Sequence, residues 1–275
     1  MLPLFYTSPT PLDGKAHQRI GLRPDFGFAF AQGAQAVPVN AVEMSSLCHC
    51  YPIVFVPGPE VSAVALLGLQ ESQNLFVDAD GQWADGLYIP AYIRRYPFIL
   101  SQMPGGENLL CVDMKEEVIE QDGGQPFFDP HGRPSQVSAR ALDFCSSYDA
   151  AAKQTAALCK WLRTHCLLVD RVAQIQVGKA QIKFSGFQIV DPAALAGLAE
   201  PTLLEAFHQG WLPFIYAHVF SASQWERLTQ RWQLREVEQA VAQERNPWLE
   251  SSDLASLQPL RRAFSSAGDL GKYVE

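Results

Sequence analysis

The sequence predicts an α+β fold in which a strand-rich, antiparallel N-terminal half packs against a helical C-terminal half. Short β-branched and apolar runs, separated by turns rich in Pro and Gly, fill the chain from about Ile53 to Asp113. From Ser135 onward the apolar residues recur at helical spacing instead. Because each of these elements has one apolar face, the strands and the long helix are expected to cover each other. We expect one domain over residues 1–250, followed by a partly ordered tail over residues 251–275.

The composition is that of a globular protein with an acidic balance. The 275 residues are 48% hydrophobic and 18% charged, and this length can bury a core without disulfides or a metal. The formal net charge is −8, and no block of like charges occurs. These features argue against a general nucleic-acid binder and against a protein that binds anionic membranes.

The N-terminus and the cysteines predict a cytoplasmic location. The first nine residues have neither the basic region nor the apolar run of a secretory signal, and no apolar run elsewhere is long enough to span a bilayer. The six cysteines lie in apolar or helical patterns and are expected to be free thiols that bind no metal: Cys48, Cys50, Cys111, Cys145, Cys159 and Cys166.

The first part of the chain is expected to be irregular up to a short helix. Residues 1–36 show no sustained period apart from an extended stretch at His17–Leu22. Asn40 and Glu43 have the spacing of a capping box, which predicts a helix that ends before Pro52.

Short strands are expected between this helix and Asp113, at Ile53–Val56, Val61–Leu69, Asn74–Val77, Pro97–Ser101 and Leu109–Asp113. The first two flank Pro57-Gly58-Pro59-Glu60, which is typical of a hairpin turn. Pro90–Arg95 has room for one or two helical turns.

The C-terminal half is expected to be helical except for one hairpin. Ser135 begins a long amphipathic helix that ends near Cys166. Alternating residues on both sides of Gly178-Lys179 predict a hairpin of Val172–Val177 and Gln181–Val190. Further helices are expected after the Asp191 N-cap, over Pro201–Gln209 and Leu212–Phe220, and from Ser223 towards Glu244.

No motif identifies a nucleophile, a nucleotide site or a metal centre, so no cofactor is expected. Cys48-His49-Cys50 has zinc-ligand side chains, but its spacing favours buried thiols beside a histidine at a helix end. Asp129-Pro130-His131 is interpreted as a capped surface turn rather than part of an iron site.

The segment from Trp83 to Phe98 is rich in groups that recognise ligands. The candidate ligand-binding residues are Trp83, Tyr88, Arg94 and Arg95, together with Asp129. Paired arginines beside aromatic rings can hold a carboxylate or a phosphate while the rings stack on an apolar body. Alternatively, the two arginines form ion pairs with acidic residues such as Asp78, Asp80 or Asp113. Because adjacent residues on a helical turn face different ways, at least one arginine is expected to be structural.

This segment also resembles the bacterial SapC-like family, which takes its name from a surface-layer-associated protein and is distinct from the permeases of that name. The matching elements are Tyr51-Pro52-Ile53, the strand ending at Gly68, Asn74-Leu75-Phe76, Tyr88-Ile89-Pro90, Ile93-Arg94-Arg95, Pro97-Phe98, Phe128-Asp129, Gly132, Gly186, Asp191, Gly210, Tyr216 and Ser221. The resemblance spans about residues 38–228 and implies a soluble bacterial protein. The family has no agreed catalytic residues, so the resemblance assigns no roles.

Two functions remain open at this point. In the first, the protein is a non-enzymatic binding or adaptor protein that takes a small anionic ligand or a protein partner. In the second, it is an enzyme or enzyme subunit acting on a small anionic or peptide substrate, with a site that includes Arg94, Arg95, Asp129 and either His131 or His218. The absence of a recognisable catalytic motif favours the first.

Overall fold

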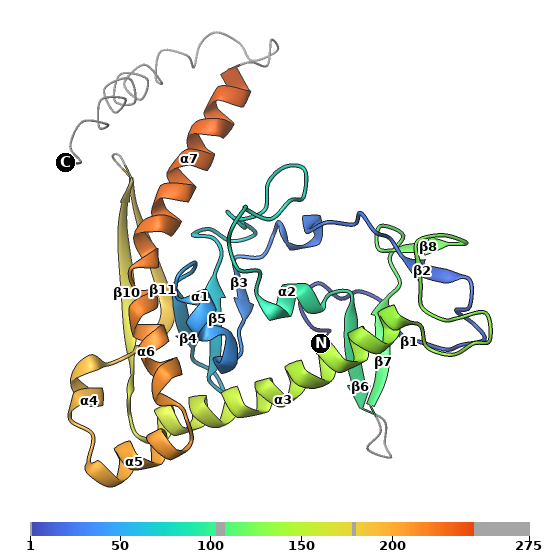
Figure 1. Ribbon diagram of the computed structural model, residues 1–275. Coiled ribbons are helices and arrows are strands. Elements are labelled where there is room, and N and C mark those ends of the chain that lie inside the picture. Colours follow the sequence, from blue (N-terminus) through green and yellow to red (C-terminus); the bar gives the residue numbers. More distant parts are fainter. Residues whose placement is uncertain (1, 103–107, 178–179, 245–275) are drawn as a thin grey trace, which may run out of the picture. The chain divides into compact units, whose positions relative to one another are not determined.

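The computed structural model describes residues 2–102, 108–177 and 180–244 (Figure 1). The chain divides into two compact units, Met1–Arg231 and Trp232–Glu275. The first unit contains every strand and every helix up to the first turns of the last one. The fold is α+β, as the sequence predicts. The tail expected over 251–275 lies outside the described residues.

The largest sheet has five strands in the order β10-β11-β4-β5-β3. Its strands are β3 (Ala36–Pro38), β4 (Ile53–Val56), β5 (Ser62–Leu66), β10 (Leu168–Val177) and β11 (Ala180–Val190). The two hairpins predicted from the sequence, β4–β5 and β10–β11, are both antiparallel pairs. One residue pair, Gln188 opposite Phe55, joins the second hairpin to the first.

Two smaller sheets complete the strand-rich part. One has the order β1-β7-β6 and is built from β1 (Pro9–Pro11), β6 (Phe98–Gln102) and β7 (Asn108–Asp113). The other has the order β8-β2-β9 and is built from β8 (Ile119–Gln121), β2 (Ile20–Leu22) and β9 (Gln125–Pro126). All their strand pairs are antiparallel.

The short helices lie before and between the strands. They are η1 (Ala29–Ala31), η2 (Ala41–Glu43), α1 (Met44–Leu47) and α2 (Ala91–Arg95). The capping box expected at Asn40 and Glu43 is present at the start of η2. After the second hairpin come α4 (Pro192–Ala196), α5 (Glu200–His208), α6 (Leu212–Ser221) and α7 (Gln224–Glu244). The Asp191 carboxylate accepts a hydrogen bond from the amide of Ala193 and caps α4, as predicted.

The long helix α3 (Gln136–Thr164) packs against β5 of the large sheet and against β6 and β7 of the second sheet (Figure 1). Ser135 is its N-cap, as the sequence predicts. Its buried residues recur at helical spacing: Ser138, Ala141, Cys145, Tyr148, Thr155, Leu158, Cys159, Trp161 and Leu162. Cys145 and Ala141 share an apolar cluster with Phe98 and Val112 of the second sheet. The predicted packing of strands on this helix is therefore confirmed.

Two local predictions are wrong. Asn74–Val77 is not a strand: Val77 makes one isolated bridge to Trp83, and the buried Asn74 side chain holds the loop by bonding to Ala31 O and Phe76 N. Pro9–Pro11, expected to be irregular, pairs with β7. Both outcomes depend on contacts with distant parts of the chain, which an apolar run or its absence does not reveal.

His218 of α6 connects two strands where the large sheet has few backbone bonds. Its Nε2 atom accepts a hydrogen bond from Val190 N at 3.0 Å, and its Nδ1 atom lies 2.9 Å from Ile53 O. This pattern requires a neutral imidazole with the proton on Nδ1. Burial lowers the pKa of His218 to about 4. The histidine therefore acts as a neutral polar link between β4 and β11.

Candidate functional site

The two adjacent arginines of α2 point into different surroundings. Arg94 is exposed; its Nε atom donates to Ile89 O at 3.0 Å and its Nη2 atom donates to the Tyr88 hydroxyl at 2.7 Å. Its guanidinium also lies over the rings of Tyr88 and Phe144, at 5.2 and 5.3 Å from their centroids. The Arg94 side chain thus ties α2 to Tyr88 and Ile89, the residues that precede the helix.

Glu43 links the same region to η2. Its carboxylate accepts hydrogen bonds from Asn40 N at 3.0 Å and from Ala91 N at 2.8 Å. The side chain is buried, and this burial raises its pKa above the ordinary value for a glutamate. The Glu43 carboxylate therefore connects the first residue of α2 to the start of η2.

Arg95 is buried among tyrosines, with 7% of its surface exposed. The guanidinium carbon lies 4.4 Å from the ring centroid of Tyr148, 4.7 Å from that of Tyr92 and 5.7 Å from that of Tyr6. The guanidinium charge offsets part of the rise that burial causes in the pKa of the Tyr6 and Tyr92 phenols. Its Nε atom is buried and has no hydrogen-bond partner. We call Arg95, Tyr6, Tyr92 and Tyr148 the arginine cage.

No counter-ion for Arg95 is found among the described residues. Lys115 pairs with Asp113 instead, and Arg19 pairs with Asp122. Among its neighbours, the groups that act most strongly on the pKa of Arg95 are the three cage tyrosines and Cys145. Burial raises the pKa of all three phenols and raises that of Cys145 to about 12. All four groups are therefore neutral near pH 7, and the arginine charge is not balanced by them.

The alternative of ion pairs between these arginines and Asp78, Asp80 or Asp113 is not realised. Asp78 accepts bonds from Asp80 N and Gln82 N within its own turn. Asp113 is fully buried and accepts bonds from Thr7 N, Ser8 N and the Tyr96 hydroxyl, at 3.0, 2.6 and 3.0 Å.

Asp113 also holds the N-terminal segment that supplies Tyr6 to the cage. Besides the two amide bonds to this carboxylate, Lys115 Nζ donates to Phe5 O at 3.2 Å, and the Tyr6 hydroxyl donates to Phe98 O at 2.6 Å. Phe5 and Tyr6 pack with Tyr96 in an aromatic cluster. The segment thus closes one side of the cage.

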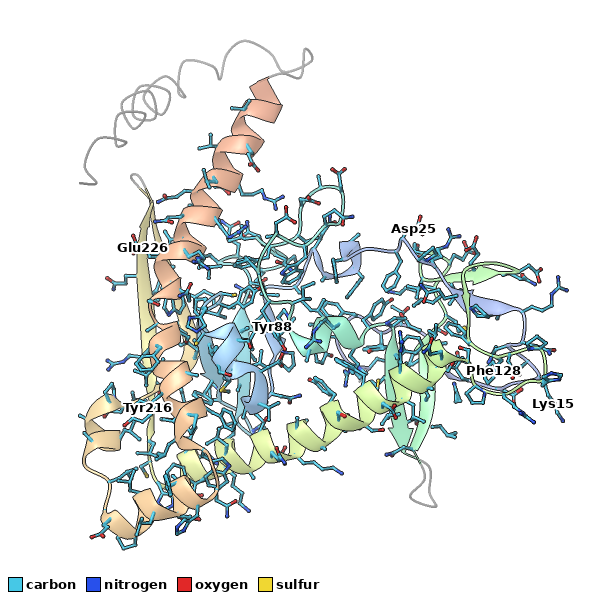
Figure 2. The ribbon with its side chains drawn as sticks, in the orientation of Figure 1. Lys15, Asp25, Tyr88, Phe128, Tyr216 and Glu226 are labelled. Atoms are coloured by element: carbon cyan, nitrogen blue, oxygen red, sulfur yellow. The ribbon has the colours of Figure 1, made fainter. Side chains whose placement is uncertain are left out.

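The other two candidate residues lie outside the cage. Trp83 is buried, donates from Nε1 to the Tyr51 hydroxyl at 3.1 Å and stacks on Phe76. Asp129 accepts bonds from His131 N at 2.8 Å and Arg133 N at 2.9 Å, which lowers its pKa. This is the capped turn expected from the sequence. Figure 2 shows Phe128, the neighbour of Asp129, well apart from Tyr88.

The two histidines considered for an enzyme site, His131 and His218, do not lie in the arginine cage. Both ring nitrogens of His218 are engaged by backbone groups of β4 and β11. His131 is exposed on the Asp129 turn. The structure does not bring together Arg94, Arg95, Asp129 and a histidine as one group, whereas it adds Tyr6, Tyr92 and Tyr148 around Arg95.

All six cysteines are free thiols, and five of them are buried, Cys166 being the exposed one. Cys48 and Cys50 are among the buried five, and across the described ranges no group of three or more His, Cys, Asp or Glu residues could hold a metal ion.

The thiols give a direct test of this burial. In the native protein we expect one thiol, Cys166, to react rapidly with a thiol reagent and five to react slowly, because burial shields them and raises the pKa of Cys145 and Cys159 to about 12 and about 11. In denaturant all six should react at once. Cys166→Ser should remove the fast phase, and a fast phase that survives this substitution would contradict the assignment.

Comparison with known proteins identifies a family. The family model described as SapC matches residues 12–228. No curated protein and no solved structure matches the chain. Within the described residues, no helix is both long and apolar enough to cross a membrane.

Proposed function

The chain belongs to the SapC family, and from the geometry at Arg95 we propose that it is a non-enzymatic binding protein that holds an anionic ligand on this arginine. The observation that supports the proposal is a buried guanidinium with an unpartnered Nε atom and no ion-pair partner among the described residues. An arginine stays charged at any physiological pH, so protonation cannot remove its charge. The cytoplasmic location and the contact with a protein partner stay predictions.

The energetics of the cage favour a ligand. Burying a cation in a protein costs several kcal/mol even after the surroundings relax. Each of the three tyrosine rings returns about 1–2 kcal/mol through cation–π attraction when it is desolvated. The rings therefore offset much of the cost but neutralise no charge. A bound anion would supply the opposite charge and would satisfy the free Nε–H donor.

Thermal melts with simple anions test the proposal. We expect at least one of acetate, phenylacetate, inorganic phosphate and phenyl phosphate to raise the melting temperature of the full chain, relative to chloride at equal ionic strength. An anion present at about a hundred times its Kd stabilises by about 2.7 kcal/mol, which is a shift of about 5 °C or more for a chain of this size.

Two variants show whether the shift comes from the cage. Arg95→Met keeps the apolar stem and removes the charge, and it should abolish the shift. Arg140→Met removes an exposed arginine of α3 and should leave the shift intact. If no anion stabilises the protein, or if Arg95→Met responds as the parent does, the proposed function is wrong.

A further inference from the structure

We infer that the ligand of the arginine cage is a monocarboxylate with an aromatic or apolar body, rather than a phosphate ester; this inference rests on the function proposed above. The charge balance is the first argument. Lys115, a cation that contacts the N-terminal segment, pairs with Asp113 at 3.7 Å and donates to Phe5 O. Arg94 points to Tyr88 and Ile89. A ligand at Arg95 therefore meets one guanidinium that has no ion-pair partner among the described residues.

One positive charge in a poorly solvated site matches one negative charge. A carboxylate carries a single charge, whereas a phosphate monoester carries close to two above about pH 7. The second charge of a bound phosphate monoester would be left unpaired among aromatic rings, where charges are costly. The site therefore discriminates by charge in favour of the carboxylate.

Few hydrogen-bond donors in the cage remain for an anion. The Tyr6 hydroxyl donates its proton to Phe98 O, and the Tyr92 hydroxyl donates to Leu4 O at 3.2 Å. These two phenols therefore have no proton left for an anion. The unpartnered Nε–H of Arg95 is therefore the donor that the cage offers to an anion, and a carboxylate oxygen can accept it.

The surroundings favour an apolar or aromatic ligand body. Tyr6 and Phe5 belong to a ring cluster in which Phe30 stacks on Tyr96 with centroids 4.1 Å apart and Phe5 packs edge-on to Phe30 at 5.1 Å. Phe5 also packs against Tyr92 at 5.8 Å. A flat ring attached to the carboxylate would add aromatic contacts of the kind that already hold this cluster together.

Access to the buried Nε atom requires one side of the cage to move. Tyr92 and Tyr148 lie on helices, whereas Tyr6 lies on the non-helical N-terminal segment. Phe5 in that segment has a φ of 80°, a conformation that is unfavourable for a bulky residue. The side of the cage formed by Tyr6 is therefore the side that moves when a ligand binds.

Calorimetric titration of the full chain at about pH 8 tests the inference with three probes that share a phenyl ring. Phenylacetate carries one charge, phenyl phosphate about two and phenylacetamide none. We expect phenylacetate to bind at least about tenfold more tightly than either of the others. Acetate, which lacks the ring, should also bind at least about tenfold more weakly. Arg95→Met should lose the phenylacetate binding, and Arg140→Met should keep it.

The outcomes separate the ligand class from the function. If phenyl phosphate binds as tightly as phenylacetate and Arg95→Met abolishes both, the carboxylate inference is overturned while the anion-binding function stands. If phenylacetamide binds as tightly as phenylacetate, the argument from charge is overturned. If acetate binds as tightly as phenylacetate, the argument from the aromatic body is overturned. If no anion binds in a way that depends on Arg95, the proposed function itself fails.

Discussion

Replacing Asp113 with alanine is expected to lower the free energy of unfolding by about 3–5 kcal/mol. The carboxylate is fully buried and accepts bonds from Thr7 N, Ser8 N and the Tyr96 hydroxyl. Alanine would leave these donors without a partner, and the desolvation penalty of each would then count against the fold. Urea unfolding followed by circular dichroism measures the change.

Two further variants make the Asp113 result specific. Asp113→Asn keeps a side-chain oxygen for the two amides and should lose less than the alanine variant. Asp143→Ala removes an exposed carboxylate of α3 and should change stability by no more than about 0.5 kcal/mol. A loss for Asp113→Ala as small as that for Asp143→Ala would show that the carboxylate does not anchor the N-terminal segment.

The second large effect is expected at His218. Substituting alanine should cost about 3–5 kcal/mol, since it opens a cavity and leaves Val190 N and Ile53 O unpaired in the large sheet. His49→Ala, at an exposed position, is the matched control and should have little effect. Thermal or urea unfolding of both variants at about pH 7.5 measures the difference.

The pH dependence of stability identifies the His218 contribution. The imidazole has a pKa of about 4 in the folded chain, against about 6.5 when unfolded, so the unfolded state binds the proton more readily. The contribution of His218 to the free energy of unfolding is complete above about pH 6.5. It falls by about 3 kcal/mol in all as the pH drops towards 4. His218→Ala should remove this part of the pH dependence of the unfolding free energy between pH 4 and 6.5. An unchanged slope would contradict a neutral, buried His218.

The local features of the fold could be predicted from the sequence. The hairpins β4–β5 and β10–β11, the capping box at Asn40 and the start of α3 at Ser135 each depend on neighbouring residues. The pairing of Pro9–Pro11 with β7 could not be predicted in this way, because it joins segments about a hundred residues apart. Strand propensity is set largely by such distant neighbours.

The candidate site was predicted in part. The concentration of aromatic residues around Arg94 and Arg95 indicates a site at α2, and the adjacency of the two arginines predicts that their side chains diverge. Tyr6 and Tyr148 could not be included, because they reach Arg95 only through the folding of the N-terminal segment and of α3. Conversely, Asp129 was included on its chemistry, yet its carboxylate is used by its own turn.

The stability of the ligand-free Arg95→Met variant tests the central claim most directly. Protein refolded from denaturant and dialysed, so that no ligand remains, should show an unfolding free energy within about 1 kcal/mol of the parent chain, because methionine fills similar space and removes the cost of a buried, unbalanced charge. Arg95 would then be retained for binding rather than for stability. A loss of about 3–5 kcal/mol, comparable to that expected for Asp113→Ala, would contradict the account and make the arginine cage a structural element.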